Sequence, residues 1–282
     1  MKTGLVLEGG GMRGLFTAGI LDVFMENDIE FEGAVGVSAG ALFGCNLKSK
    51  QPGRAVRYNV RYCRDPRYVS MLNLITTGNI FGVDFCYRRI PFELDIWDHE
   101  TFEKNPMEFF VVCTDVNSGK PYYYRCTDGM EKDIEYFRAS GSMPLVSRVV
   151  KIGDREFLDG GVSDAIPLEF MERQGYDRIV VIQTRPEGYR KEPNRLMPLI
   201  KARYSRKYPE LVKDMENRHI MYNDELDYIA EREKTGDVYV IRPRRDLRIS
   251  QTANDPEELK RVYKTGRYMA KQCLEEVKDF LV

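Results

Sequence analysis

The chain has 282 residues, of which 43% are apolar and 31% charged, and its formal net charge is −1. These values predict a globular protein with a large core and exclude the basic excess of general nucleic-acid binders, so we expect no nucleic-acid partner. No run approaches the ~18 apolar residues of a membrane-spanning helix. The N-terminal residues do not resemble a secretory signal, so we expect a cytoplasmic protein.

The first fifty residues alternate between short apolar runs and helical patterns. A buried strand is predicted over 4–9, followed by a glycine loop and a helix over 15–27. A second strand over 33–37 leads directly into a second helix over 39–49. This β-loop-α-β-turn-α order predicts an α/β protein with a parallel sheet.

The rest of the chain adds strands and a final helix. Turn chemistry joins the next strands into two hairpins, one over 109–126 and one over 151–161. Two further strands are predicted over 178–184 and 237–243. From Asp255, a suitable capping residue, one amphipathic helix is predicted to run to the end of the chain, with a structural role only.

The cysteines and histidines give no sign of a metal site. The six cysteines are at least 13 residues apart and form no C-x-x-C motif, and the chain has only two histidines, His99 and His219. A zinc site needs a closer set of ligands, and reduced cysteines are typical of cytosolic proteins. We therefore predict no metal.

The glycine loop at 9–14 matches G-x-G-x-x-G between a strand and a helix, which is the setting of a dinucleotide site. That site also needs an acidic residue at the end of the second strand, whereas Glu30 and Glu32 precede the strand. We therefore expect no nicotinamide or flavin cofactor. The same backbone amides suit the oxyanion of an acyl-transfer intermediate. Arg13 either reinforces that cradle or pairs with a surface carboxylate.

Ser38 lies in the sequence Gly36-Val37-Ser38-Ala39-Gly40, which fits G-x-S-x-G between a strand and a helix. The turn is so tight that residues two before and two after the serine crowd each other, and glycine relieves the clash. The pattern favours a nucleophile over a structural serine. Such a hydroxyl needs a base.

The base is predicted to be a carboxylate. His219 follows Ser38 and Asp159 in the chain order of α/β-hydrolase triads, but Ser38 comes too early in the chain for that fold, and both histidines sit in charged surroundings. Asp159 ends a strand and precedes two glycines, so it can turn toward a serine and take its proton. Asp154 is interpreted as an ordinary turn residue.

Together, the motifs at 9–14, 36–40 and 159–161 resemble the patatin-like phospholipase family, and 139–146 is similar to the family's segment between nucleophile and aspartate. The resemblance is clear over about 3–185 and is closest to the compact bacterial members. It implies a three-layer α/β/α fold with a mainly parallel sheet. It implies a single domain over 1–282, in which 186–282 adds helices, one strand and the final helix to the core.

The resemblance also implies roles for residues of this chain. Ser38 would be the nucleophile, Asp159 the base, and the loop would supply the oxyanion hole, chiefly through the amides of Gly10 and Gly11. The supporting motif positions are Gly9, Met12, Arg13 and Gly14 in the loop, Gly36 and Gly40 around the serine, and Gly160 and Gly161 after the aspartate. Gly161 is a minor departure, since many members have Gly-Ala after the aspartate.

The activity implied by the resemblance is hydrolysis of fatty-acyl esters of lipids through an acyl-enzyme, without metal or cofactor. Acyltransferases, thioesterases using the same dyad and non-catalytic lipid-binding proteins remain alternatives. Three segments are open to two interpretations. Residues 190–218 are either a helical hairpin with a buried stripe or a contact with anionic lipid at a membrane surface. Residues 242–248 either bind a phosphate headgroup or balance carboxylates, and 70–85 form an acyl channel or ordinary core.

Overall fold

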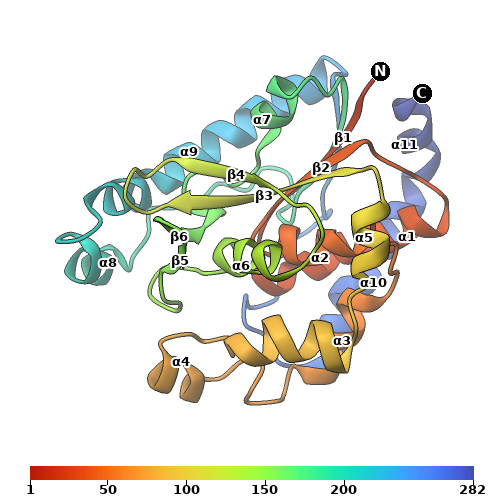
Figure 1. The fold of residues 1–282 in the computed structure, drawn as a ribbon. Coiled ribbons are helices and arrows are strands. Elements are labelled where there is room, and N and C mark those ends of the chain that lie inside the picture. Colours follow the sequence, from red (N-terminus) through yellow and green to blue (C-terminus); the bar gives the residue numbers. More distant parts are fainter.

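The computed structural model describes residues 1–282 as a sheet covered by helices (Figure 1). The strands are β1 (Thr3–Leu7), β2 (Gly33–Val37), β3 (Glu108–Asp115), β4 (Pro121–Arg125), β5 (Val150–Ile152), β6 (Arg155–Asp159), β7 (Arg178–Ile182) and β8 (Val238–Ile241). The helices are α1 (Gly14–Glu26), α2 (Ala39–Lys48), α3 (Arg54–Tyr62), α4 (Met71–Thr77), α5 (His99–Lys104), α6 (Glu131–Ser140), α7 (Leu168–Arg173), α8 (Met197–Tyr204), α9 (Pro209–Lys234), α10 (Pro256–Gln272) and α11 (Leu274–Leu281). The remaining helical segments are the 3₁₀ turns η1 (Gly11–Arg13) and η3 (Gly160–Val162) and the ten-residue π-helix η2 (Phe85–Leu94).

The sheet has the order β5-β6-β3-β2-β1-β7-β8, with β4 also paired to β3. Strands β3, β2, β1, β7 and β8 are parallel neighbours, whereas the two predicted hairpins add β4, β5 and β6 in antiparallel orientation. The expected α/β class with a mainly parallel central sheet is therefore confirmed. Because β1, β2 and β7 lie side by side, the loops after them converge at one edge of the sheet.

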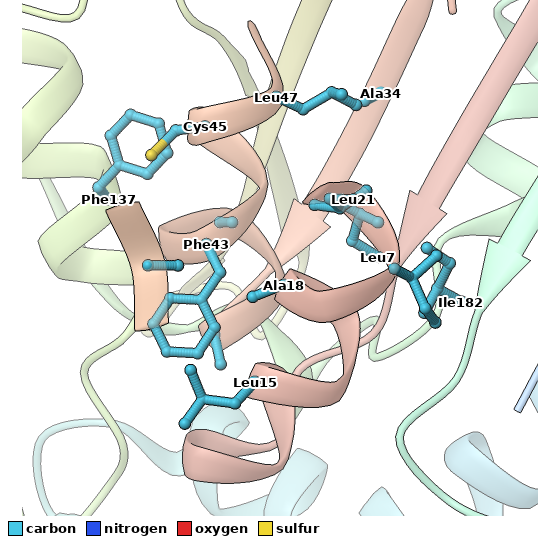
Figure 2. Packing of buried hydrophobic residues seen from close by; sticks show 14 of the residues in the cluster. Leu7, Leu15, Ala18, Leu21, Ala34, Phe43, Cys45, Leu47, Phe137 and Ile182 are labelled. Atoms are coloured by element: carbon cyan, nitrogen blue, oxygen red, sulfur yellow. The ribbon is translucent and has the colours of Figure 1, made fainter. Parts of the chain in front are cut away.

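Helices cover both faces of the sheet and bury separate apolar clusters (Figure 1). The larger cluster joins α1, α2, α3, α6 and α10 to one face, and the other contains residues of α7 and α9. Figure 2 shows Leu7 and Ile182 of the sheet beside Leu21 of α1, and Phe137 of α6 beside Cys45 of α2. The continuous apolar runs of β1 and β7 follow from this burial on both faces.

The C-terminal helix differs from the expectation of one continuous helix. It begins at the predicted cap, Asp255, whose side chain accepts a hydrogen bond from the Glu257 amide, but it divides into α10 and α11 at Cys273. The backbone of Cys273 leaves the helical region, with φ −107° and ψ 11°. The break turns α11 against the sheet, where Phe280 packs on Tyr239. Sequence periodicity does not reveal the break, because the apolar face of α10 continues into α11.

The structure bears on two of the segments for which the sequence allowed two interpretations. Residues 190–218 contain α8 and the start of α9, which bury Ile200, Leu211 and Met215 in a small cluster, as a helical hairpin with a buried stripe would. In the basic run 242–248, Arg242 pairs with Glu233 and Asp246 pairs with Arg185, so these members balance opposite charges.

Candidate active site

Ser38 forms a sharp turn between β2 and α2. Its backbone has φ 54° and ψ −123°, a conformation that is strained for a residue with a side chain and is typical of functional sites. The close packing of this turn explains the flanking glycines. A Cβ on Gly40 would lie 2.2 Å from the Leu7 carbonyl oxygen, and one on Gly36 would lie 2.5 Å from the Ala41 Cα. The Ser38 amide donates a 2.9 Å hydrogen bond to the Ser140 hydroxyl.

The register of the sheet brings Asp159 to Ser38. Val37, the last residue of β2, is opposite Val112 of β3, and Asp159, the last residue of β6, is opposite the next residue, Cys113. The two strands therefore end at adjacent positions along β3. As a result the Ser38 hydroxyl and the Asp159 carboxylate lie near each other, and Ser38 lowers the pKa of Asp159.

Asp159 is buried, with 4% of its surface exposed, and its immediate partners hold it in place. Its amide donates to the Ser142 carbonyl at 2.8 Å, and its Oδ1 accepts from the Gly161 amide at 2.8 Å. Burial raises the pKa of Asp159, because a carboxylate loses the stabilisation of water. The nearby Ser38 hydroxyl and the positive charge of Arg218 act in the opposite direction.

The glycine loop lies directly beside Ser38, because a Cβ on Gly9 would be 2.9 Å from the Ser38 Cβ. Within the loop, the Met12 amide donates to the Gln251 carbonyl at 3.2 Å and the Arg13 amide donates to the Gly10 carbonyl at 3.3 Å. The amides of Gly10 and Gly11 have no such partner. Two free amides next to a serine can stabilise an oxyanion.

An apolar pocket opens at Ser38 on the face covered by α2, α3, η2 and α6. Of its 21 lining residues, 15 are hydrophobic, which makes it suitable for a hydrocarbon chain. Leu42, Ile90 and Phe137 are among them, and Phe81 lines the pocket from the segment 70–85. Phe81 is therefore the residue through which the segment 70–85 lines the pocket. The helix in that segment, α4, buries no side chain.

The pocket offers no free charge to a ligand. Arg54 is the one charged residue that lines the pocket, and its side chain is buried. Its Nη1 donates to the Asn46 Oδ1 at 3.0 Å, and its Nη2 donates to the Asp95 carbonyl at 2.7 Å. Because these donors are satisfied within the protein, the pocket favours an uncharged chain over an anion.

Neither histidine is hydrogen-bonded to Ser38 or Asp159. His99 stacks on Phe92 at 4.9 Å and packs against Trp97, in an aromatic cluster near the start of α5. His219 belongs to α9, and its buried Nδ1 has no hydrogen-bond partner. The exposed Asp154 occupies the turn between β5 and β6. Arg13 is 9% exposed and its Nε has no hydrogen-bond partner, so the alternative in which Arg13 pairs with a surface carboxylate is wrong.

The structure adds three residues that sequence patterns do not point to. Ser140 receives the hydrogen bond of the Ser38 amide, Gln251 holds the glycine loop, and Arg218 donates from its Nε to the Gly161 carbonyl at 2.5 Å. Each is a common residue type in an unremarkable local pattern. Ser140 lies in the segment 139–146 that was singled out, but no local signal distinguishes Arg218 from other charged residues of its helix.

Comparisons with known proteins agree on the region that contains the site. The family model "Patatin-like phospholipase" matches residues 5–171, and a "Domain of unknown function (DUF6363)" matches residues 208–282. Arg218 and Gln251 therefore come from the second match and contact the first.

Two curated proteins are similar in sequence. The uncharacterized protein YjjU of Escherichia coli (strain K12) is 28% identical over 99% of this chain and 79% of its own length. A putative patatin-like phospholipase domain-containing protein, M110.7, of Caenorhabditis elegans is 26% identical over 64% of this chain, which spans 16% of that protein.

Two solved structures align over 98% of the chain. VipD from Legionella pneumophila has a TM-score of 0.48 at 13% identity, with 67% of that chain covered. The type III effector protein ExoU has a TM-score of 0.40 at 14% identity, with 53% covered.

Proposed function

The chain belongs to the patatin-like phospholipase family, whose model matches more than half of its residues, and from this premise we propose that it is a serine hydrolase of fatty-acyl lipid esters. The observation that supports the proposal most is the meeting of Ser38 and Asp159 at adjacent positions along β3. Two unpartnered amides and an apolar pocket lie next to the same serine.

In the proposed reaction, Ser38 Oγ attacks the ester carbonyl carbon while its proton passes to the Asp159 carboxylate. The negative oxygen accepts hydrogen bonds from the amides of Gly10 and Gly11. When the tetrahedral intermediate collapses, the alcohol leaves with the proton from Asp159, and the acyl group stays on Ser38. Water then gives a proton to Asp159 and attacks the acyl-enzyme. Ser38 Oγ leaves and takes that proton back, and the fatty acid is released.

The environment of Asp159 suits a base of this kind. Burial raises its pKa above the ordinary value, and a base is more effective as its pKa approaches the working pH. The nearby Ser38 hydroxyl and the charge of Arg218 limit the rise, which favours the ionised form that can accept a proton. The acyl chain of the substrate would occupy the apolar pocket.

Fluorophosphonate labelling followed by intact-mass measurement tests the nucleophile. We expect one adduct on the wild type, none on Ser38→Ala, and one on Ser118→Ala, a control that removes an exposed turn serine. An adduct on Ser38→Ala, or none on folded wild type, would contradict the proposal. Product analysis in water distinguishes hydrolysis from acyl transfer, since a hydrolase releases free fatty acid even when glycerol is present as a competing acceptor.

We also propose that the protein is cytoplasmic and meets its substrate at a lipid surface through α4. Met71, Leu72 and Ile75 of this helix are 62%, 64% and 78% exposed. An isolated β-bridge pairs Val69, just before α4, with Phe81, just after it, and Phe81 lines the pocket. Exposed apolar side chains at the pocket wall are suited to the boundary of headgroups and acyl chains. The structure has no helix long and apolar enough to span a bilayer.

A single domain over 1–282 is proposed as well. The segment 186–282 supplies β8, which pairs with β7, and α10, which packs against α1. That helix contact is close, since a Cβ on Gly19 would lie 2.2 Å from the Tyr263 carbonyl oxygen. Limited proteolysis tests it: one domain predicts that no stable fragment ending near residue 185 accumulates.

A further inference from the structure

Helix α9 is attached to the chain segment that follows Asp159, and Glu225 makes the central contact. The Glu225 Oε1 accepts a hydrogen bond from the Ala165 amide at 3.0 Å, and its Oε2 accepts one from the Ile166 amide at 3.1 Å. One carboxyl group therefore fixes two consecutive amides that belong to no helix or strand. Glu225 lies in the region 208–282, whereas the segment that it binds lies in the region 5–171.

A second carboxyl group, that of Asp164, lies at the same place. Asp164 directly precedes Ala165, and its Oδ2 accepts a 2.5 Å hydrogen bond from the Tyr123 hydroxyl of β4. Both carboxyl groups are partly buried, and burial raises the pKa of each. The negative charge of Asp164 raises the pKa of Glu225 further. Two neighbouring carboxyl groups of this kind lose their protons in two separate steps.

The surroundings of the pair supply no free positive charge. The other titratable groups that face it are Tyr123 of β4 and two residues of α7, Glu169 and Arg173. Arg173 is the cation among them, and it pairs with Glu169 at 3.0 Å. A retained proton is therefore the means by which the repulsion between Asp164 and Glu225 is avoided.

The pair is connected to Asp159 through the turn that lies between them. The amides of Ser163 and Asp164 both donate to the Gly160 carbonyl, at 3.1 Å and 3.0 Å. Within the same turn, the Gly161 amide donates to the Asp159 Oδ1 at 2.8 Å. A displacement of the residues held by Glu225 would therefore move this turn, and the Asp159 carboxylate with it.

We propose that Asp164 and Glu225 share one proton and so hold the segment after Asp159 against α9, which makes Glu225 a positioning residue for the base. This inference rests on the proposed function and gives the region 208–282 a role in it. The dyad alone predicts a loss of rate in acid, where Asp159 becomes protonated. The pair predicts a second loss in alkali, because two carboxylates that have lost the shared proton repel each other.

The first arm measures kcat and KM for hydrolysis of monomeric p-nitrophenyl butyrate by Glu225→Ala. We expect kcat to fall by about tenfold to 100-fold, the usual effect of misplacing a catalytic group by about 1 Å. KM should stay near the wild-type value, because neither Asp164 nor Glu225 lines the apolar pocket. Asp224→Ala removes an exposed carboxylate from the preceding position of α9 and should keep the wild-type kcat.

The second arm follows kcat with pH in Asp164→Asn. The amide group of this variant offers Glu225 a proton donor at every pH, and its oxygen can accept from the Tyr123 hydroxyl. We expect Asp164→Asn to retain more activity than Glu225→Ala at pH 7. It should also lack the wild-type decline toward about pH 9, the range in which buried glutamic acids ionise. Asp224→Asn, at an exposed position, should keep that decline.

The third arm measures thermal unfolding in the Ser38→Ala background. It needs no hydrolysis, so a failure of the proposed reaction leaves it interpretable. A raised pKa in the folded state stabilises the protein at low pH, and this contribution is lost as pH rises through that pKa. From about pH 6 to about pH 9, we expect Ser38→Ala to lose about 2–4 °C more in Tm than the variant that also carries Asp164→Asn.

Each outcome decides the proposal. A lower kcat at nearly unchanged KM in Glu225→Ala, with the alkaline decline lost in Asp164→Asn, supports it. A wild-type kcat in Glu225→Ala that circular dichroism shows to be folded overturns the positioning role. If Glu225→Ala does not fold, the pH profile decides, since an alkaline decline in Asp164→Asn equal to that of the wild type overturns the proposal. An equal loss of Tm with and without Asp164→Asn overturns the shared proton.

Discussion

The two sides of Ser38 differ in what they offer a substrate. On one side lies a pocket whose charged member, Arg54, is fully engaged by Asn46 and Asp95. Next to the glycine loop, by contrast, the buried Arg13 forms no ion pair, and its Nε has no hydrogen-bond partner. An arginine whose donors are all hydrogen-bonded within the protein therefore has a structural role. An arginine with an unpartnered donor is better suited to binding a ligand.

Asp159 lies where the two sides meet, and its replacement should have the largest effect. Asp159→Asn keeps the shape but removes the base, so we expect kcat to fall by at least about 10³-fold. Asp154→Asn, in an exposed turn, is the matched control. Ester hydrolysis by the purified variants measures this, and turnover of Asp159→Asn near the wild-type rate would exclude the dyad.

The same variant should be more stable than the wild type at neutral pH. Burial raises the pKa of Asp159 in the folded state, so ionisation opposes folding as pH rises above the ordinary value of ~3.9. Asparagine has no such ionisation. We expect a higher melting temperature for Asp159→Asn at pH 7 and a smaller difference near pH 3, where the carboxyl is protonated in both states. A difference that grows toward low pH would contradict this sign.

The glycine loop, which we propose as the oxyanion hole, lies beside Ser38, and Gly11→Ala should have the next largest effect. Gly11 has φ 57°, and a Cβ there would lie 2.6 Å from the Gln251 carbonyl oxygen, so the loop must shift. We expect kcat to fall by about 10²–10³-fold, the usual effect of losing one oxyanion donor. Gly188→Ala is the control, because its φ is 76° and nothing lies within 4 Å. Equal losses in both variants would indicate backbone strain rather than a role in the oxyanion hole.

On the apolar side, replacing Met71, Leu72 and Ile75 of α4 by serine should weaken contact with lipid. Each side chain contributes apolar area that would leave water at a membrane surface, so we expect vesicle partitioning to fall by about tenfold or more. Co-sedimentation with phosphatidylglycerol vesicles measures it. Ile220→Ser, at an exposed apolar residue of α9, should keep wild-type partitioning. Partitioning unchanged in the α4 variant would remove this helix from the lipid contact.

Much of the fold follows from local patterns in the sequence. The glycine loop, the Ser38 turn and both hairpins are short-range features, because each depends on crowding or turn chemistry within a few residues. The division of the C-terminal helix at Cys273 is different, since its apolar face continues across the break. Only the packing of Phe280 against Tyr239 distinguishes two helices from one.

By itself, the sequence determined which residues have the chemistry for a nucleophile, a base and an oxyanion loop, since those roles require particular residue types in tight turns. The tertiary structure alone decided that Arg13 is buried without an acidic partner, that Ser140 and Gln251 hold the serine and the loop, and that Lys191 and Arg218 lie near Asp159. The physical reason is range. A turn is specified by its own backbone geometry, whereas the charge around a buried group depends on chain segments that are brought together only when α9 packs against the sheet.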